Sequence, residues 1–307
     1  MSKEKELYLI ILYYKYIHIE DPNSFRDFQI KICSKLNLLG RIIVSYEGIN
    51  GTLSGSNKNI AEYMTCLKKI KSFEDIDFKI STYHKHVFPK LSVKLKKEIV
   101  NLKLEQDIFP EYNSNNYLEP KKFFEMLKEK DVIVLDVRND YEYNLGHFQN
   151  SINPKISNFR DFPEWLDKNL SFLKNKKILT YCTGGVRCEK VSILLRSKKI
   201  NEVYQLKGGI INYSQDPETQ GQLFDGQVYV FDQRITTKVN QKKHIVVGKD
   251  FFDQTPCERY INCGNPSCNK QILCNETNEN KYLGSCSKKC SINEKNRYLL
   301  TKNKIND

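Results

Sequence analysis

The stretch ILTYCTGGVRCEK, residues 178–190, places a cysteine, two glycines, an arginine and a second cysteine between two different local patterns. Residues 177–181 are mostly β-branched and aromatic, a composition that predicts a strand. Beyond the stretch, Val191, Leu194 and Leu195 recur at helical spacing and predict a helix over residues 188–198. The stretch is therefore expected to form a strand, a tight loop and the start of a helix.

The loop between Cys182 and Arg187 has the composition of an anion-binding turn. Its residues are Thr183, Gly184, Gly185 and Val186. Adjacent glycines let backbone N–H groups point inward, where a Cβ would obstruct them. Near a helix N-terminus and an arginine, the pKa of a thiol falls from about 8.5 into a range of about 3.5 to 7.5. Cys182 is therefore predicted to be a reactive thiolate, and the alternative is a buried cysteine beside an ordinary glycine turn.

Length and hydropathy favour a multidomain protein outside the membrane. The 307 residues suffice for two or three domains. Mean hydropathy is -0.57, and the most apolar N-terminal run, residues 7–14, is far shorter than a membrane span. No small-residue cleavage site follows that run, so we expect neither export nor membrane insertion. The ten cysteines are then expected to be thiols or metal ligands in a reducing cytoplasm.

The charge balance favours a polyanionic partner. Lysine and arginine number 49 against 37 acidic residues, which gives a formal net charge of +12. Such an excess is typical of proteins that bind nucleic acid, and it favours a polyanionic partner such as RNA; no DNA partner is expected. The alternative is compositional drift, because lysine, isoleucine and asparagine are all abundant, as in proteins from AT-rich genomes.

Residues 1–100 are predicted to form an α+β domain of the ferredoxin-like type. The expected elements are a strand at 7–17, a helix from 22, strands at 41–46 and 52–56, a helix at 57–69 and a strand at 77–82. The sequence EGINGT, residues 47–52, is expected to turn the chain between two of these strands. Residues 92–100, SVKLKKEIV, are predicted to add an edge strand. Its Lys94, Lys96 and Lys97 are candidate phosphate ligands, and the alternative is a role in solubility alone.

The remainder is predicted to comprise a linker, a parallel α/β domain and a cysteine-rich end. Residues 101–119 contain a proline and many asparagines with little periodicity, so they are expected to be a linker. Strands and helices alternate over residues 120–215, which predicts a parallel sheet with its site at the carboxyl ends of the strands, where Cys182 falls. Residues 216–307 are expected to hold a hairpin near 225–235 followed by the cysteine-rich tail.

The tail combines many cysteines with few apolar residues. The six cysteines are Cys257, Cys263, Cys268, Cys274, Cys286 and Cys290. A small unit with this composition is expected to fold around a metal, most plausibly zinc held by thiolates. The spacings are irregular and contain no clean pair of Cys-x-x-Cys knuckles, so disulfides or a redox relay remain open.

Three motifs together resemble a rhodanese domain over residues 118–215. They are LDVRNDYEYNLGHFQNSINP at 135–154, YCTGGVRCEK at 181–190 and YQLKGGIINY at 204–213. The resemblance implies that Cys182 is the nucleophile, cradled by the loop and able to carry a persulfide. The related phosphatases have five residues between cysteine and arginine, whereas this loop has four. A phosphatase is therefore disfavoured.

With EGINGTLSG at 47–55, LSVKLKKEIV at 91–100 and the cysteine-rich end, the resemblance extends to nearly the whole chain. The chain is similar to the rhodanese-domain tRNA uridine hydroxylases. That resemblance implies an oxidoreductase that converts the wobble uridine of the anticodon loop to 5-hydroxyuridine with O2. The electron donor is not implied. No flavin fingerprint is present, so no bound organic cofactor is expected. The five histidines have no facial-triad partner by spacing, so no resident redox metal is expected either.

The expected mechanism begins with addition of the Cys182 thiolate to C6 of uridine, stabilised by the loop and Arg187. Cys188 is either a resolving thiol or a packing residue. One rival function is a sulfurtransferase that acts through a Cys182 persulfide. The other is a non-catalytic RNA-binding module on a rhodanese scaffold.

Overall fold

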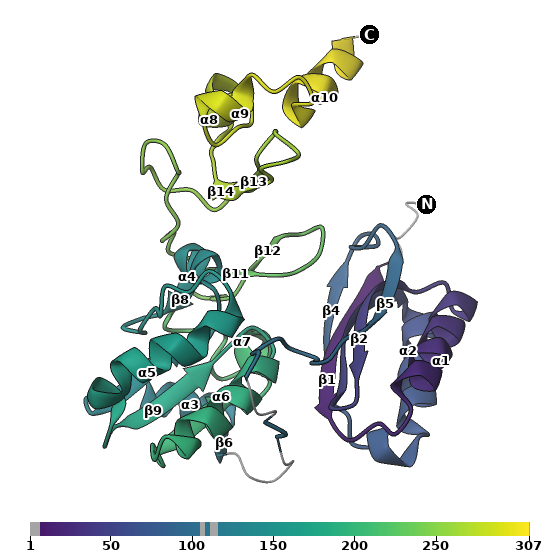
Figure 1. The fold of residues 1–307 in the computed structure, drawn as a ribbon, viewed down its shortest axis with the longest axis vertical. Coiled ribbons are helices and arrows are strands. Elements are labelled where there is room, and N and C mark those ends of the chain that lie inside the picture. Colours follow the sequence, from purple (N-terminus) through teal and green to yellow (C-terminus); the bar gives the residue numbers. More distant parts are fainter. Residues whose placement is uncertain (1–6, 105–107, 111–115, 307) are drawn as a thin grey trace.

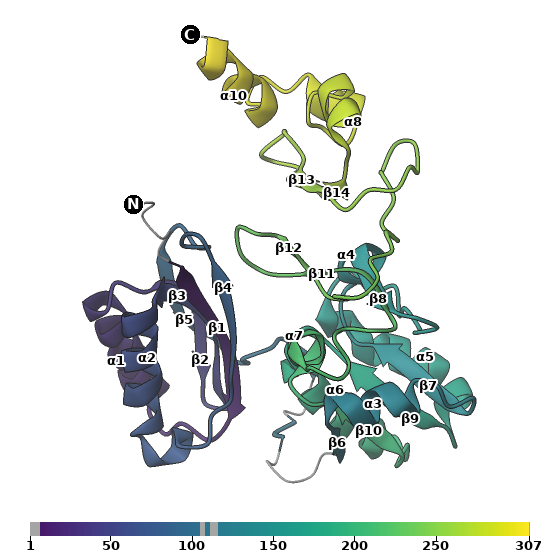
Figure 2. The ribbon, with the colours of Figure 1, turned by 180° about the vertical axis from the view of Figure 1, so that it is seen from behind.

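The computed structural model describes residues 7–104, 108–110 and 116–306. The α+β domain predicted for residues 1–100 is hereafter the front domain, and the parallel α/β domain predicted for residues 120–215 is the central domain. Within the described residues, the front domain (purple and blue in Figure 1) lies beside the central domain (teal and green). The cysteine-rich end (yellow) extends away from the central domain, as the view from behind in Figure 2 confirms. No helix among the described residues is long and apolar enough to cross a membrane.

The front domain confirms the predicted ferredoxin-like fold. Its elements are β1 (Tyr8–Tyr16), α1 (Pro22–Lys35), β2 (Leu39–Ser45), β3 (Gly48–Ser56), α2 (Asn57–Lys68), the short helix η1 (Lys71–Phe73), β4 (Phe78–Tyr83) and β5 (Leu91–Leu95). The sheet order is β4-β1-β3-β2-β5, and both α-helices cover one face (Figure 1). Strand β5 pairs in parallel with β2 at the edge, which confirms the predicted edge strand, but it ends at Leu95 instead of residue 100, so Lys96 and Lys97 follow it. The other face of the sheet is left to meet the central domain.

The EGINGT segment departs from expectation, because most of it is strand rather than turn. Ser45 pairs with Gly48, so only Tyr46 and Glu47 make the turn between β2 and β3. The glycines serve a close approach instead: a Cβ on Gly51 would lie 2.4 Å from the ring of Tyr13 on β1. The glycines of EGINGT are therefore explained by the close packing of β3 on β1, not by a turn over the whole segment.

The central domain is the predicted parallel α/β unit. Its elements are β6 (Asn116–Leu118), α3 (Pro120–Met126), β7 (Val132–Asp136), α4 (Asp140–Leu145), β8 (Gly146–Phe148), η2 (Phe159–Asp161), α5 (Phe162–Leu173), β9 (Lys177–Tyr181), α6 (Val186–Ser197), β10 (Val203–Leu206) and α7 (Gly209–Gln215). The parallel sheet has the order β6-β10-β9-β7. Successive residues of β9 face opposite sides: Ile178 packs with the apolar residues of α5 and α6, and Leu179 packs with those of α3 and α7. Each face of the sheet is thus covered by helices.

The predicted linker, residues 101–119, is partly incorporated into the central domain. Residues 105–107 and 111–115 lie outside the described residues. Leu102, Leu104 and Ile108 pack against the core of the central domain, and β6 adds a parallel edge strand next to β10. A three-residue strand gives too short a pattern to stand out in an asparagine-rich segment.

The chain then forms β11 (Phe224–Tyr229) and β12 (Thr236–Lys238), the predicted hairpin, with β11 also pairing with β8. The cysteine-rich end follows with β13 (Tyr260–Asn262), β14 (Gln271–Leu273), α8 (Glu276–Lys281), α9 (Lys288–Ser291) and α10 (Arg297–Asn306). Its short elements form one small apolar cluster around Ile261 and Ile272, and Cys257, Tyr260 and Leu273 pack in a second one with Leu145 of the central domain.

Candidate active site

Cys182 lies where the sequence predicted, in the loop between β9 and α6 at the carboxyl end of the central sheet. The helix begins at Val186, two residues earlier than expected. The backbone N–H of Gly185 donates to Cys182 Sγ over 3.1 Å, so the loop wraps the sulfur. The carbonyl of Cys182 accepts from the backbone N–H of Ile210 at 3.0 Å, which ties the loop to α7. The two glycine-containing motifs of the central domain therefore meet at Cys182.

The environment of Cys182 favours the thiolate. Burial raises its pKa, but a hydrogen bond from the Cys188 side chain, the charge of Arg187 and the backbone N–H groups of Arg187 and Cys188 lower the pKa to about 5. Burial and donation to Cys182 raise the pKa of Cys188 well above its ordinary value. The pair therefore consists of one thiolate and one thiol at neutral pH.

Arg187 is fixed from behind by a residue that sequence reasoning missed. Glu142 on α4 accepts from both terminal nitrogens of the guanidinium, at 2.6 and 2.8 Å, and its carboxylate is fully buried. Thr183 Oγ1 accepts a further hydrogen bond from Arg187 at 3.3 Å. Because Glu142 and Thr183 hold its guanidinium, Arg187 keeps the loop in place and supplies positive charge near the sulfur. The only sequence signal for Glu142 was its place inside the motif at 135–154.

A cavity of about 660 Å³ lies between the front and central domains, above this loop. Cys182, Thr183, Gly184, Val186 and Arg187 line one wall. The opposite wall comes from β1, β2 and β3 of the front domain, including Leu12, Tyr14, Asn50 and Thr52. The volume falls within the range of small-ligand pockets and accommodates a nucleobase.

The front domain packs closely on the loop. A Cβ on Gly184 would lie 2.7 Å from Leu12 Cδ2, and one on Gly185 would lie 2.7 Å from Tyr14 Oη. Tyr14 Oη donates to Glu189 Oε1 at 2.8 Å across the same contact. The two glycines therefore allow the front domain to pack directly on the loop that carries Cys182.

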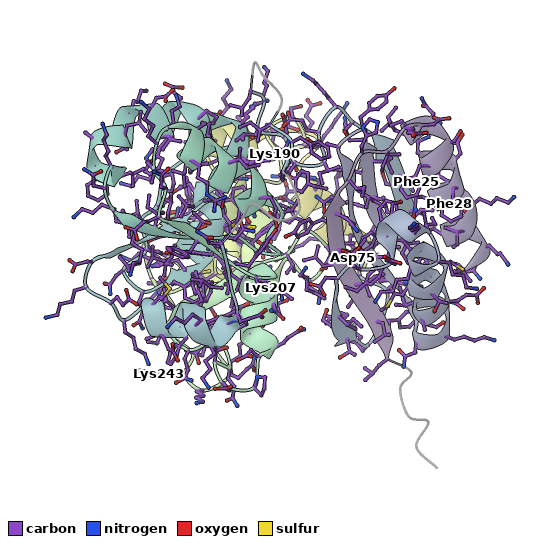
Figure 3. The ribbon with its side chains drawn as sticks, turned by 90° about the horizontal axis from the view of Figure 1, so that it is seen from below. Phe25, Phe28, Asp75, Lys190, Lys207 and Lys243 are labelled. Atoms are coloured by element: carbon purple, nitrogen blue, oxygen red, sulfur yellow. The ribbon has the colours of Figure 1, made fainter. Side chains whose placement is uncertain are left out.

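A buried lysine joins the domains. Lys190 Nζ lies 2.8 Å from Glu47 and 2.7 Å from Glu98, both contributed by the front half of the chain. Lys190 is only 2% exposed. Figure 3 places it on the side of the central domain that faces the front domain. This ion-pair cluster fixes the relative position of the cavity walls.

Exposed cations and one aromatic ring surround the cavity. Of the predicted phosphate ligands, Lys96 and Lys97 line the cavity, whereas Lys94 is exposed on β5 outside the lining. Arg41 and Arg160, from different domains, also line it. Phe231 lines the cavity and is 46% exposed. Sequence reasoning missed Arg41, Arg160 and Phe231 because they come from segments far apart in the chain that meet only in the folded protein.

The six tail cysteines separate into two groups. The sulfur atoms of Cys263, Cys268, Cys286 and Cys290 all lie within 4.8 Å of one another. Cys257 instead packs with Leu145 and Tyr260, and Cys274 packs in the cluster of Ile261 and Ile272. The predicted set of six is therefore reduced to a group of four.

Family models match three consecutive parts of the chain. They are described as UPF0176 acylphosphatase like domain (residues 8–99), Rhodanese-like domain (119–216) and Rhodanase C-terminal (225–291). These three segments correspond to the front domain, the central domain, and the hairpin with most of the cysteine-rich end.

Curated relatives match over nearly their whole length. A protein of Onion yellows phytoplasma named tRNA uridine(34) hydroxylase is 58% identical over 299 residues, covering 97% of both chains. The protein of the same name from Aster yellows witches'-broom phytoplasma is 59% identical over 95% of both chains. That of Bacillus licheniformis is 51% identical over 96% of this chain and 92% of its own. Because these relatives share 51% to 59% identity over more than nine-tenths of each chain, the chain belongs to the tRNA uridine(34) hydroxylase family.

Proposed function

We infer that this protein hydroxylates C5 of uridine 34, the wobble base of the tRNA anticodon, with molecular oxygen as the co-substrate. The observation that carries the proposal is a thiolate nucleophile at the base of a cavity flanked by cations, in a chain 58% identical to a tRNA uridine(34) hydroxylase over 97% of its length. A tRNA substrate implies the cytoplasm as the working compartment.

Covalent catalysis accounts for activation of the base. The Cys182 thiolate adds to C6 of uridine, and the electron pair of the C5–C6 double bond moves onto C5 and the C4 carbonyl as an enolate. The enolate carbon reacts with O2 to give a C5 hydroperoxide after protonation. An external two-electron donor reduces its O–O bond, which releases one oxygen atom as water and leaves a hydroxyl on C5. Loss of the C5 proton and departure of the thiolate from C6 then restore the double bond.

The groups around Cys182 have different roles in these reaction steps. The N–H of Gly185 and the thiol of Cys188 stabilise the thiolate before addition and after its release. Arg187 is a positioning residue, because Glu142 and Thr183 engage its guanidinium.

Recognition of tRNA falls to the cavity rim. Bases of an anticodon loop are single-stranded and can be splayed out into a pocket. Arg41, Lys96, Lys97 and Arg160 are placed to contact the phosphates on either side of the base. Phe231 offers an exposed ring on which a neighbouring base can stack.

A tRNA carrying 5-fluorouridine at position 34 tests the chemistry. The fluorine cannot leave as a proton does, so a thiolate added to C6 becomes trapped as a covalent adduct. We expect a tRNA adduct that maps to Cys182 by peptide mass spectrometry and is missing in Cys182→Ser. An adduct on another residue, or none with the native protein, contradicts the route. Release of sulfur to cyanide from a Cys182 persulfide, with no adduct, would instead indicate a sulfurtransferase.

A further inference from the structure

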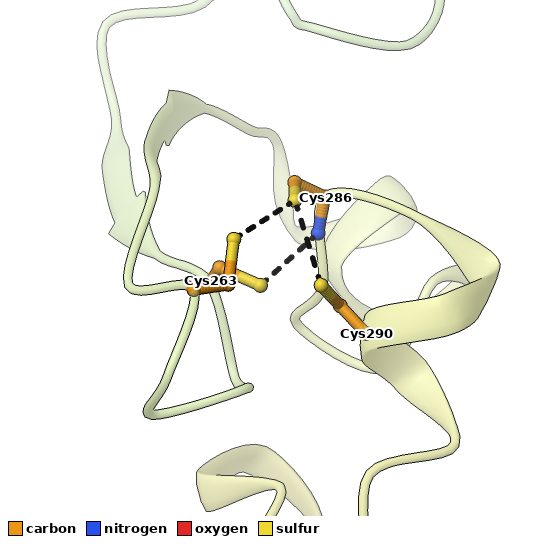
Figure 4. A group of neighbouring side chains, drawn as sticks. Cys263, Cys286 and Cys290 are labelled. Carbon is orange, nitrogen blue, oxygen red and sulfur yellow. Dashed lines mark hydrogen bonds between the residues drawn. The ribbon is translucent and has the colours of Figure 1, made fainter.

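The cysteine-rich end contains a site that the catalytic cavity does not use. We propose that Cys263, Cys268, Cys286 and Cys290, hereafter the cysteine cluster, bind one structural Zn²⁺ ion. Cys263 follows β13 and Cys268 lies in the turn before β14, while Cys286 and Cys290 flank the start of α9. Figure 4 shows the labelled side chains of Cys263, Cys286 and Cys290 converging on one point from these two segments.

The sulfur spacing matches a tetrahedral thiolate site. With Zn–S bonds of about 2.3 Å, tetrahedral geometry places the sulfurs about 3.8 Å apart. Cys286 Sγ lies 3.7 Å from Cys268 Sγ and 4.0 Å from Cys290 Sγ. A disulfide requires an S–S separation of about 2.0 Å, and all ten cysteines of the chain are free. The spacing therefore fits metal coordination and leaves the disulfide alternative without support.

Donors around the sulfurs fit the charged, metal-bound form. The backbone N–H of Cys286 points at Cys263 Sγ over 3.5 Å, and the side-chain amide of Asn265 points at Cys290 Sγ over 3.6 Å. Donors of this kind orient thiolate ligands and disperse their negative charge. Four thiolates around a dication carry a net charge of -2, so such donors stabilise the complex.

The two ligand-bearing segments are held in place by other side chains. Asn296 is fully buried, and its amide donates to the carbonyls of Leu283 and Ser291 on either side of Cys286. Arg297 donates to the carbonyl of Cys263 at 2.6 Å. The ligand geometry is therefore built into the fold of this region.

The region also lacks an apolar core large enough to fold by itself. Between Tyr260 and Ser291 it has a two-stranded sheet and two short helices, with Ile261, Ile272 and Cys274 as the central apolar cluster. Units below about 40 residues usually need a metal, disulfides or oligomerisation. A closed site of four thiolates selects zinc or iron, and a purely structural role without redox change favours zinc.

Zinc in this position would also brace the catalytic domain. Tyr260, on β13, donates from its hydroxyl to the backbone carbonyl of Tyr141 at 2.6 Å. Tyr141 precedes Glu142, the partner of Arg187, on α4. Loss of the metal is therefore expected to loosen α4 as well as the tail.

Elemental analysis of the untagged full-length protein tests the proposal. We expect about one zinc per chain by inductively coupled plasma mass spectrometry, and at least a fivefold lower content in Cys286→Ser and Cys290→Ser. Cys257→Ser is the matched control, because Cys257 lies in the same region outside the cysteine cluster, and it should keep its zinc. No zinc after growth with added zinc, iron in its place, or full zinc in a Cys286→Ser/Cys290→Ser protein would overturn the assignment.

A second measurement uses the native protein alone, so its result does not depend on whether a cysteine variant folds. The native protein is alkylated with N-ethylmaleimide before and after treatment with a zinc chelator, and labelled peptides are mapped. The four cysteines of the cysteine cluster should be protected first and labelled at least tenfold faster after chelation. Labelling that chelation leaves unchanged would overturn the proposal, whatever the outcome for tRNA hydroxylation.

Discussion

Arg187 and Glu142 form a buried ion pair with two contacts, at 2.6 and 2.8 Å, directly behind the loop that carries Cys182. Glu142 comes from α4 and Arg187 from α6, so the pair joins two helices that meet at the carboxyl end of the sheet. Burial alone would raise the pKa of Glu142, but the charge of Arg187 and its hydrogen bonds hold that pKa below the ordinary value. The pair is therefore ionised and keeps the loop in shape.

Glu142→Gln should destabilise the fold, because it leaves the buried Arg187 guanidinium without its carboxylate partner. Removing one partner of a buried pair costs about 3 to 5 kcal/mol. The measurement is the free energy of unfolding in guanidinium chloride. Glu164→Gln is the control, since Glu164 pairs with Lys168 on the surface and should change stability by less than about 1 kcal/mol. Equal effects of the two substitutions would refute a structural role for the buried pair.

Alkylation of Cys182 should titrate at low pH. Its pKa is lowered from the ordinary 9.0 to about 5, so the rate of reaction with iodoacetamide should reach half its maximum near pH 5. Cys188→Ala removes a hydrogen bond to the sulfur and should move that midpoint upward. A midpoint near 9 in the native protein would contradict the thiolate. Cys182→Ser identifies the background from other cysteines.

The same shift makes the stability of the fold depend on pH. Between pH 5 and 9 the unfolded chain binds the Cys182 proton and the folded chain does not, so this group raises the free energy of unfolding as pH rises. Its contribution is complete above pH 9 and is lost as pH falls through 5. Comparing the native protein with Cys182→Ser across this pH range isolates the contribution of Cys182. The difference in their free energies of unfolding should grow with pH, and a constant difference would be evidence against a lowered pKa of Cys182.

Lys190→Met should separate the two cavity walls. The substitution keeps the aliphatic stem but leaves Glu47 and Glu98 facing each other without their shared cation. We expect a larger radius of gyration in small-angle X-ray scattering and a raised KM for tRNA. Lys207→Met is the control, because Lys207 pairs with Glu119 on the exposed surface. A Lys190→Met protein with native dimensions and KM would show that the ion pairs of Lys190 with Glu47 and Glu98 are not needed to hold the domains together.

Arg160→Ala should weaken tRNA binding through phosphate contact. Each lost phosphate contact reduces the slope of log affinity against log salt by about 1. Lys243→Ala, at an exposed lysine outside the cavity lining, should leave the slope unchanged. Fluorescence anisotropy at several salt concentrations measures both. If Lys243→Ala has the larger effect, tRNA approaches by another surface.

The sequence predicted the elements that consecutive residues form, but it did not predict contacts between residues far apart in the chain. Cys182, its loop and the flanking strand and helix follow one another along the chain, so composition and periodicity sufficed. The contact of Arg187 with Glu142 spans 45 positions and has no local pattern. The prediction of a turn over EGINGT was wrong for a related reason, because its glycines are required by close contacts with β1, Gly48 with the backbone of Lys15 and Gly51 with the ring of Tyr13.

The cysteines show the same limit. Their residue type predicted a thiolate cluster, but spacing did not select Cys263, Cys268, Cys286 and Cys290 from the six in the tail. That choice depends on how β13 and α9 approach each other. The same holds for the cavity between the two domains, whose lining includes Arg41, Arg160 and Phe231 from separate parts of the chain.

The most direct test of the central claim is nucleoside mass spectrometry of tRNA from a host that lacks its own wobble-uridine hydroxylation. The host expresses either the native protein or Cys182→Ser, under 18O-labelled oxygen or without oxygen. The account predicts 5-hydroxyuridine carrying one 18O atom at position 34, only with native protein and oxygen. Unmodified uridine, a sulfur-containing uridine, or hydroxylation that persists in Cys182→Ser would contradict it.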